Sequence, residues 1–140
     1  MTLLLDSSAL VTALSPDQQG HERLVAALQR EPSPLVLSPF VLAEVDYFLL
    51  KYGGVRQELR FLAEVAAEQY VLAPFAAADV AAASAVVKRH PELAIGVTDA
   101  SIVVLAGRYD TGRVFTLDER HFRALRTPSG KRFTILPADA

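Results

Sequence analysis

Short apolar runs alternate along the chain with segments whose apolar residues recur at helical spacing. The runs predict five buried strands, at residues 3–5, 35–37, 70–72, 114–116 and 133–136. Helical patterns follow the first strand and then span residues 21–30, 39–52, 55–67, 76–90 and 98–106, with a loop or short helix at 117–122. Strands that alternate with helices favour a parallel sheet covered on both faces. We therefore expect a three-layer α/β/α sandwich with a central, mostly parallel sheet of four to five strands.

The helix after the second strand carries two acids on different sides. Ser38 and Pro39 start it, as a cap residue followed by proline at the first helical position. Its apolar stripe consists of Val41, Val45, Phe48 and Tyr52. At about 100° per residue, Glu44 lies roughly 70° from the middle of this stripe and Asp46 roughly 130° away on the other side. The pattern predicts that Glu44 borders the buried face and that Asp46 points to solvent.

Acidic residues follow three of the predicted strands. Asp6 comes directly after the first strand, Glu44 lies on the helix after the second, and Asp118 follows the fourth. A further acid, Asp99, opens the apolar helix at 98–106, for which Thr98 is the expected N-cap. Because parallel strands end at one edge of their sheet, these acids can meet in one crevice.

Four carboxylates in one crevice would repel one another unless a cation neutralised them. Oxygen ligands without a cluster of cysteine or histidine suit Mg²⁺ or Mn²⁺. Such ions can hold a phosphodiester, lower the pKa of a bound water and stabilise charge on the attacking and leaving oxygens. Each acid also has a structural explanation, since carboxylates are common as helix caps, in first helical turns and on exposed faces. The spacing alone leaves both explanations open.

Composition narrows the class of protein. A chain of 140 residues fits a single domain spanning 1–140. The absence of cysteine excludes disulfides, zinc-thiolate sites and a thiol nucleophile. No run of about eighteen apolar residues indicates a membrane span, so a cytoplasmic protein is expected. Hydrophobic residues make up 51% and mean hydropathy is +0.27, a surplus that can face a partner.

The charge of the chain is unevenly distributed. A net charge of −2 argues against nucleic acid as a partner of the whole surface. However, seven of the fourteen basic residues follow Gly107, against four acids there. The last quarter is therefore basic enough for a phosphate-binding rim, although an ordinary solvated face fits equally well.

Four short stretches carry the residues singled out above and span nearly the whole chain. They are Leu4-Leu5-Asp6-Ser7-Ser8-Ala9-Leu10, Ser38-Pro39 leading to Glu44, Val97-Thr98-Asp99-Ala100-Ser101, and Thr116-Leu117-Asp118 followed by Phe122. In this order the chain resembles the PIN-domain ribonucleases, in particular the VapC toxins of bacterial toxin–antitoxin pairs. The resemblance implies a metal-dependent endoribonuclease that cleaves structured RNA, such as tRNA or ribosomal RNA, and is neutralised by a cognate antitoxin.

The resemblance also implies roles for individual residues. By position, the catalytic acids that bind Mg²⁺ or Mn²⁺ would be Asp6, Glu44, Asp99 and Asp118. The family fills the position of Asp118 least uniformly. Groups that would orient carboxylates or waters are Ser7, Thr98 and Thr116. Members of the family are typically homodimers that bind an antitoxin segment in an apolar groove, which suits the apolar surplus.

The basic rim supplies candidates for contact with RNA phosphates. These are Arg113, Arg120, His121 and Arg123. In this interpretation His121 touches RNA rather than metal, because the acids suffice as ligands, and His21 and His90 are exposed helix residues.

Two alternatives belong to other classes. A phosphotransferase could use Asp6 as a nucleophile, but the haloacid-dehalogenase-like pattern wants a second Asp two residues on, where this chain has Ser8. A non-catalytic protein-binding module of α/β fold would use the acids as helix caps and the apolar surface for its partner. That module predicts no specific affinity for divalent metal, which separates it from the nuclease.

Overall fold

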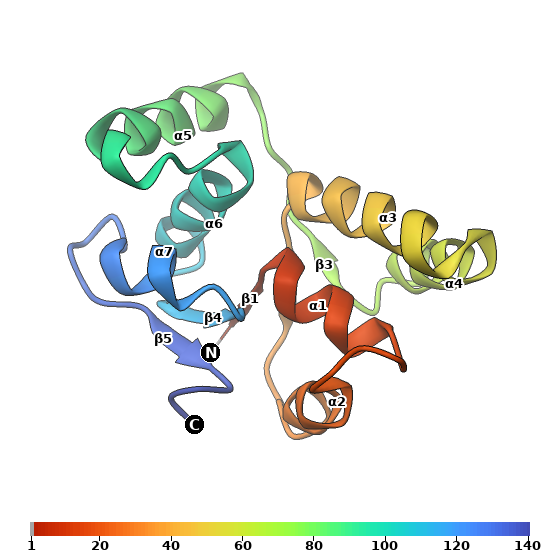
Figure 1. The fold of residues 1–140 in the computed structure, drawn as a ribbon. Helices are drawn as coiled ribbons and strands as arrows, with labels where there is room; N and C mark the ends of the chain where they lie inside the picture. The colour runs from red at the N-terminus through yellow and green to blue at the C-terminus, as the bar shows by residue number, and fades with distance from the viewer. Residues whose placement is uncertain (1) are drawn as a thin grey trace.

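The computed structural model describes residues 2–140 and has a five-stranded central sheet (Figure 1). The strands are β1 (Leu3–Leu5), β2 (Leu35–Leu37), β3 (Val71–Leu72), β4 (Arg113–Phe115) and β5 (Thr134–Leu136). They lie in the order β3-β2-β1-β4-β5, and every neighbouring pair is parallel. The predicted α/β/α architecture is confirmed, with a sheet that is wholly rather than mostly parallel.

Helices cover both faces of this sheet. They are α1 (Ser7–Leu14), α2 (His21–Gln29), α3 (Pro39–Gly53), α4 (Val55–Ala66), α5 (Ala77–Arg89), α6 (Val97–Arg108) and α7 (Glu119–Ala124), with a 3₁₀ turn η1 (Pro91–Leu93) before α6. Figure 1 shows α1 to α4 on one side of the strands and α5 to α7 on the other. Right-handed crossovers produce this division, because the chain steps from β1 to β3 in one direction and returns past β1 to β5 in the other. None of the helices in the described part of the chain is long and apolar enough to span a membrane.

The strands are apolar because helices bury both of their faces. The three leucines of β1 are buried, as are Val114 and Phe115 of β4. In such a strand successive side chains enter opposite cores, so the usual alternation of polar and apolar residues is absent. Helix α6 is apolar on most sides for the same reason, since it contacts β1, α3 and α5. The buried centre of the fold therefore consists of β1, β4 and α6.

The direction of winding reverses between β1 and β4. Leu5 pairs with Phe115, so these two strands end level with each other. In open parallel sheets, ligands bind beyond the carboxyl ends of the strands at such a switch point. Asp6 leaves β1 and Asp118 follows β4, so both acids start at the mouth of this crevice.

Helix α3 departs from the predicted stripe in its second half. Val41 and Val45 are buried as expected, but Leu49 occupies the next core position and Tyr52 is 65% exposed. Spacings of four residues keep Val41, Val45 and Leu49 on one face, whereas the predicted shift to Phe48 and Tyr52 turns away from the core. The exposed end of α3 packs beside α4 instead.

The prediction that Asp46 points to solvent is wrong. One carboxylate oxygen of Asp46 is buried, and this carboxylate raises the pKa of Glu58 on α4. The Gly53-Gly54 turn folds α4 back against α3, which the periodicity of one helix does not reveal. Asp46 does not line the crevice that contains Asp6.

Candidate active site

A cleft of about 270 Å³ lies at the carboxyl edge of the sheet. Its lining consists of Asp6, Ser8, Glu44, Gly96, Thr98, Asp99 and Asp118. The structure thus brings together all four acids that the sequence analysis singled out. They come from four separate elements: the end of β1, the middle of α3, the first turn of α6 and the N-cap of α7. The carboxyl edge of the sheet therefore holds a concentration of acidic groups.

Asp6 is the most deeply buried of these acids, at 4% exposed. Its Oδ2 accepts hydrogen bonds from Thr116 Oγ1 at 2.6 Å and Ser8 Oγ at 3.3 Å. Burial raises the pKa of Asp6 to about 6, with a smaller increase from the nearby Asp99 and an opposing effect of the Thr116 hydrogen bond. Folding therefore destabilises the ionised form of Asp6, because the buried carboxylate has lost its hydrating water and lies near other acids.

Two hydroxyls connect Asp6 to the segment after β4. Thr116 Oγ1 accepts the backbone N–H of Asp118 at 2.9 Å, and Ser8 Oγ accepts that of Leu117 at 3.0 Å. The turn that carries Asp118 is thus fastened to the residue that carries the first acid. The predicted contact of Thr116 with a carboxylate is present in the structure.

Ser8, rather than Ser7, is the serine whose hydroxyl contacts an acid of the cleft. Ser7 is buried, and within residues 2–140 its Oγ has no hydrogen-bond partner, so the expectation that it orients the acids by its hydroxyl is wrong. Adjacent serines point in different directions at the start of a helix, and only Ser8 faces the cleft. The sequence could have indicated this role for Ser8, because short polar side chains two residues apart, such as Asp6 and Ser8, often form a local hydrogen bond.

Thr98 lies beside Glu44 rather than capping α6. The N-cap of α6 is Gly96, and the helix begins at Val97, which puts Thr98 inside its first turn. From there Thr98 Oγ1 donates to Glu44 Oε2 at 3.5 Å, a long hydrogen bond. The predicted role in helix capping is wrong, whereas the contact with a carboxylate suits a group that orients Glu44.

A buried chain of hydroxyls joins α3 to α6 behind the acids. Ser101 Oγ donates to the Thr98 carbonyl at 2.6 Å, and Ser38 Oγ lies 2.7 Å from Ser101 Oγ. Since the single Ser101 proton is already used, Ser38 is the donor to Ser101, and Ser38 in turn accepts the N–H of Phe40 at 3.2 Å. The helix with Glu44 is thereby fixed against the helix with Asp99.

His121 lies between two of the acids. Its Nδ1 is 2.8 Å from Asp99 Oδ2 and 2.9 Å from Asp118 Oδ2. Burial raises the pKa of Asp99, His121 lowers it, and the charges of Asp118 and Glu44 raise it further. The sequence predicts that His121 contacts RNA phosphate, whereas in the structure its ring lies between two acids of the cleft. The sequence could have indicated the contact between His121 and Asp118, because the first helical turn brings a histidine close to an N-cap acid three residues before it.

The basic candidates for RNA contact fall in different places. Arg113 starts β4 at the opposite edge of the sheet, does not line this cleft, and binds Glu31, whose carboxylate is 2.9 Å from its Nη1. Arg123 donates to Asp139 at 2.8 Å and to Glu119 at 3.0 Å. Arg120 is exposed on α7, two residues after the cleft acid Asp118.

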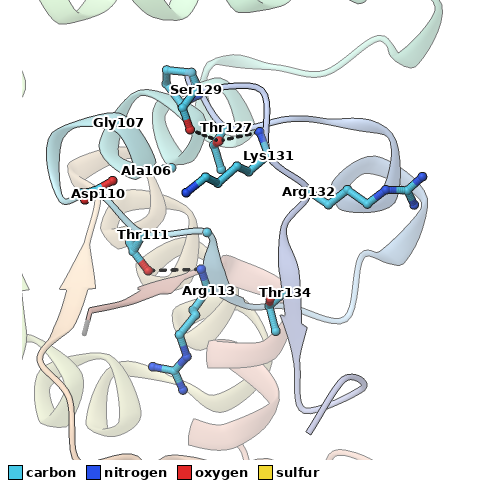
Figure 2. A pocket seen from close by; sticks show the side chains of 12 residues that line it. Ala106, Gly107, Asp110, Thr111, Arg113, Thr127, Ser129, Lys131, Arg132 and Thr134 are labelled. Carbon is cyan, nitrogen blue, oxygen red and sulfur yellow. Dashed lines mark hydrogen bonds between the residues drawn. The ribbon is translucent and has the colours of Figure 1, made fainter.

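A larger pocket of about 510 Å³ opens at the amino edge of the sheet (Figure 2). Lys131 extends across it, while Arg113 and Arg132 point out of it (Figure 2). Three of the hydroxyls there bond to neighbours: Thr127 lies 3.1 Å from Ser129, and Thr111 Oγ1 donates to the Thr2 carbonyl at 2.8 Å. This pocket has more room than the acidic cleft, and its charged lining is mainly basic, with Arg113, Lys131 and Arg132 beside Asp110.

Comparison with known proteins agrees with this geometry. The sequence profile of the PIN domain matches residues 3–127. The chain belongs to the PIN-domain family. Within that family, this PIN domain is 38% identical over 135 residues to Ribonuclease VapC26 of Mycobacterium tuberculosis, an alignment that covers 96% of this chain and 100% of the relative. The resemblance drawn from the four sequence stretches is thereby confirmed.

Solved structures show the same fold in relatives of this PIN domain. VapC20 of Mycobacterium tuberculosis, described as a toxin that cleaves the sarcin-ricin loop, superposes with a TM-score of 0.78 at 17% identity, covering 85% of this chain and 93% of that one. A toxin–antitoxin complex from Klebsiella pneumoniae superposes with a TM-score of 0.67 at 19% identity, covering 88% and 92%. At these identities the likeness supports the fold.

Proposed function

We propose that this PIN domain is the metal-dependent endoribonuclease toxin of a toxin–antitoxin pair and cleaves structured RNA. The observation that carries the proposal is the convergence of Asp6, Glu44, Asp99 and Asp118 in one cleft. Buried carboxylates that lack enough cationic partners need a divalent ion to balance them. Identity of 38% to a protein named as a ribonuclease supports the same chemistry.

The donor set fits a hard divalent ion. Carboxylate oxygens from the four acids suit Mg²⁺ or Mn²⁺. Burial raises the pKa of Asp6 and Asp99, and neighbouring acids raise it further, so a bound cation would favour their ionised forms. A bound ion would supply a water of lowered pKa and stabilise charge on the phosphodiester. Thr116 and Ser8 hold the Asp6 carboxylate in one orientation, and Thr98 does so for Glu44.

The substrate class in this proposal is structured RNA, such as tRNA or ribosomal RNA. The cleft is open to solvent. Arg120 is exposed on α7, two residues after the cleft acid Asp118, and is our candidate for contact with an RNA phosphate. VapC20, which shares the fold, is described as cleaving the sarcin-ricin loop, so ribosomal RNA is the first substrate to test.

An antitoxin is the proposed protein partner. Large apolar side chains are exposed along α3 and α4, namely Tyr47, Leu50, Tyr52, Val55 and Leu59. A patch of this kind marks a surface for a protein partner, and a related fold occurs in a toxin–antitoxin complex. A homodimer, also expected for the family, remains a prediction that light scattering tests. A cytoplasmic location belongs to the same proposal, because the RNA substrate is there.

Cleavage of total bacterial RNA tests the nuclease directly. Purified protein is incubated with Mn²⁺, with Mn²⁺ plus EDTA, and as the variants Asp99→Asn and Asp17→Asn, and new 5′ ends are mapped. Asp17 is exposed in the loop before α2, so its variant is a matched control for loss of one carboxylate. We expect discrete cuts from the wild type and Asp17→Asn that EDTA and Asp99→Asn abolish. No cleavage in any sample would favour the protein-binding module, for which the apolar surface of α3 and α4 already provides a docking face.

A further inference from the structure

Two carboxylates converge on one nitrogen of His121. Asp99 Oδ2 and Asp118 Oδ2 lie 2.8 Å and 2.9 Å from the same Nδ1 atom. A ring nitrogen carries at most one hydrogen, so the two oxygens must share it in a bifurcated hydrogen bond or one of them goes without it. A cation bound by all three atoms would satisfy both oxygens at once.

The position of the His121 ring is built into the fold. Asp118 caps α7 by accepting the backbone N–H of His121 at 3.0 Å, which places that residue one turn behind the cap. The next residue, Phe122, is fully buried and packs edge-on against Phe133 at 5.5 Å between ring centroids. The His121 side chain itself is only 19% exposed. The ring therefore stays among the acids rather than turning into solvent.

The separations also suit ligands of a single ion. Two atoms bound side by side at about 2.1 Å from a metal lie about 3.0 Å apart. The nitrogen and its two oxygens already have separations close to that value, and one ligand atom from each of Asp99, Asp118 and His121 falls within 4.8 Å of the others.

We propose that His121 Nδ1 is a metal ligand together with Asp99 and Asp118, and that this nitrogen makes the site favour a first-row transition-metal ion such as Mn²⁺ over Mg²⁺. Mg²⁺ takes oxygen ligands and keeps its waters, whereas transition metals also accept imidazole nitrogen. The inference rests on the proposed function, because it concerns the ion of the same cleft. It adds a nitrogen to a donor set that consists otherwise of oxygens.

Pulsed electron paramagnetic resonance of bound Mn²⁺ tests the assignment without any activity assay. The chain has three histidines, so the protein is prepared without a histidine tag. We expect the wild type to show coupling of Mn²⁺ to a directly bound ¹⁴N nucleus. His121→Gln loses this coupling, and the control His90→Gln, which alters a residue at the end of α5, keeps it.

Metal affinities give a second readout. Titration of each variant with Mn²⁺ and with Mg²⁺ should show that His121→Gln raises the Kd for Mn²⁺ by about tenfold or more. The Kd for Mg²⁺ should change by less than roughly threefold, since that ion relies on the carboxylates. A parallel change for both ions would contradict selectivity by the nitrogen.

The outcomes separate this inference from the proposed function. Bound Mn²⁺ without ¹⁴N coupling in the wild type would overturn the role of His121 and leave a nuclease with oxygen ligands alone. Absence of any Mn²⁺ binding would overturn both. The wild-type spectrum decides even if His121→Gln fails to fold, because it needs no variant.

Discussion

The two edges of the sheet differ in how their charged groups are paired. At the amino edge, Arg113 binds Glu31 and holds the pKa of that carboxyl near 2. At the carboxyl edge, burial raises the pKa of Asp6 to about 6 among other acids. The smaller cleft is thus the one where carboxylates outnumber basic groups, whereas the lining of the larger pocket is mainly basic. By volume the larger pocket would be the candidate active site, whereas the acids that line the smaller cleft make the cleft the better candidate.

The first prediction concerns the pH dependence of stability that the acidic cleft produces. The pKa of Asp6 rises on folding from its ordinary value of 3.8 to about 6, so the folded protein binds a proton that the unfolded chain has released. Without metal, the contribution of Asp6 to stability should therefore be greatest below about pH 4 and fall by about 3 kcal/mol as the pH rises through about 6. Asp99 acts in the same direction, because burial also raises its pKa.

Urea unfolding of the wild type and Asp6→Asn across this pH range measures the effect. The variant has no Asp6 carboxyl to ionise, so the difference in unfolding free energy between the two proteins should grow in favour of Asp6→Asn from about pH 4 to about pH 6. A difference that stays constant with pH would show that the cleft does not penalise the ionised form of Asp6.

The second prediction is that divalent metal relieves the same imbalance. Mn²⁺ at about one hundred times its Kd should stabilise the wild type by about 2.7 kcal/mol and raise its Tm. Asp6→Asn should show a smaller rise, while Asp17→Asn should respond like the wild type. Thermal melts with Mn²⁺ and with EDTA measure this, and an equal response of Asp6→Asn would remove Asp6 from the metal site.

The third prediction concerns the paired edge. Arg113→Ala leaves Glu31, whose carboxylate side chain is 6% exposed, without its cation. Because the arginine is partly exposed, we expect a loss of about 2 kcal/mol, between the values for surface and buried pairs. The Mn²⁺ response should not change. Urea unfolding at neutral pH measures the loss, with Arg132→Ala as control, and a weakened metal response would contradict the independence of the two edges.

The smallest predicted effect separates two adjacent serines. Ser8→Ala removes a hydrogen bond to Asp6 and one from the Leu117 N–H, which should cost about 1 kcal/mol. Ser7→Ala should cost less, because the Ser7 hydroxyl has no partner in the described part of the chain. Comparing both variants by urea unfolding tests which serine supports the cleft. A larger loss for Ser7→Ala would reverse the assignment.

The sequence was informative about features that depend on a single strand and the residues directly after it. Buried parallel strands are apolar along their whole length, so β1, β2 and β4 could be recognised from short apolar runs. Acids that follow such strands must lie at the carboxyl edge, which is why Asp6 and Asp118 could be placed there before the structure was known.

The sequence was uninformative where two distant elements meet. Arg113 and Glu31 lie 82 residues apart, and nothing local distinguishes a paired arginine from one that is free to bind RNA. The same holds for Asp46, whose neighbour Glu58 is on another helix. For His121, the spacing to Asp118 was visible, but its contact with Asp99 depends on how α7 packs beside α6.

The most direct test of the central claim compares one residue from each edge in the same assay. Initial rates of ribosomal RNA cleavage with Mn²⁺ are measured for the wild type, Glu44→Gln in the acidic cleft and Lys131→Ala in the larger pocket. We expect a loss of about a hundredfold or more for Glu44→Gln and a rate within about threefold of the wild type for Lys131→Ala. Full activity of Glu44→Gln together with loss of activity in Lys131→Ala would place the chemistry at the amino edge and contradict an active site in the acidic cleft.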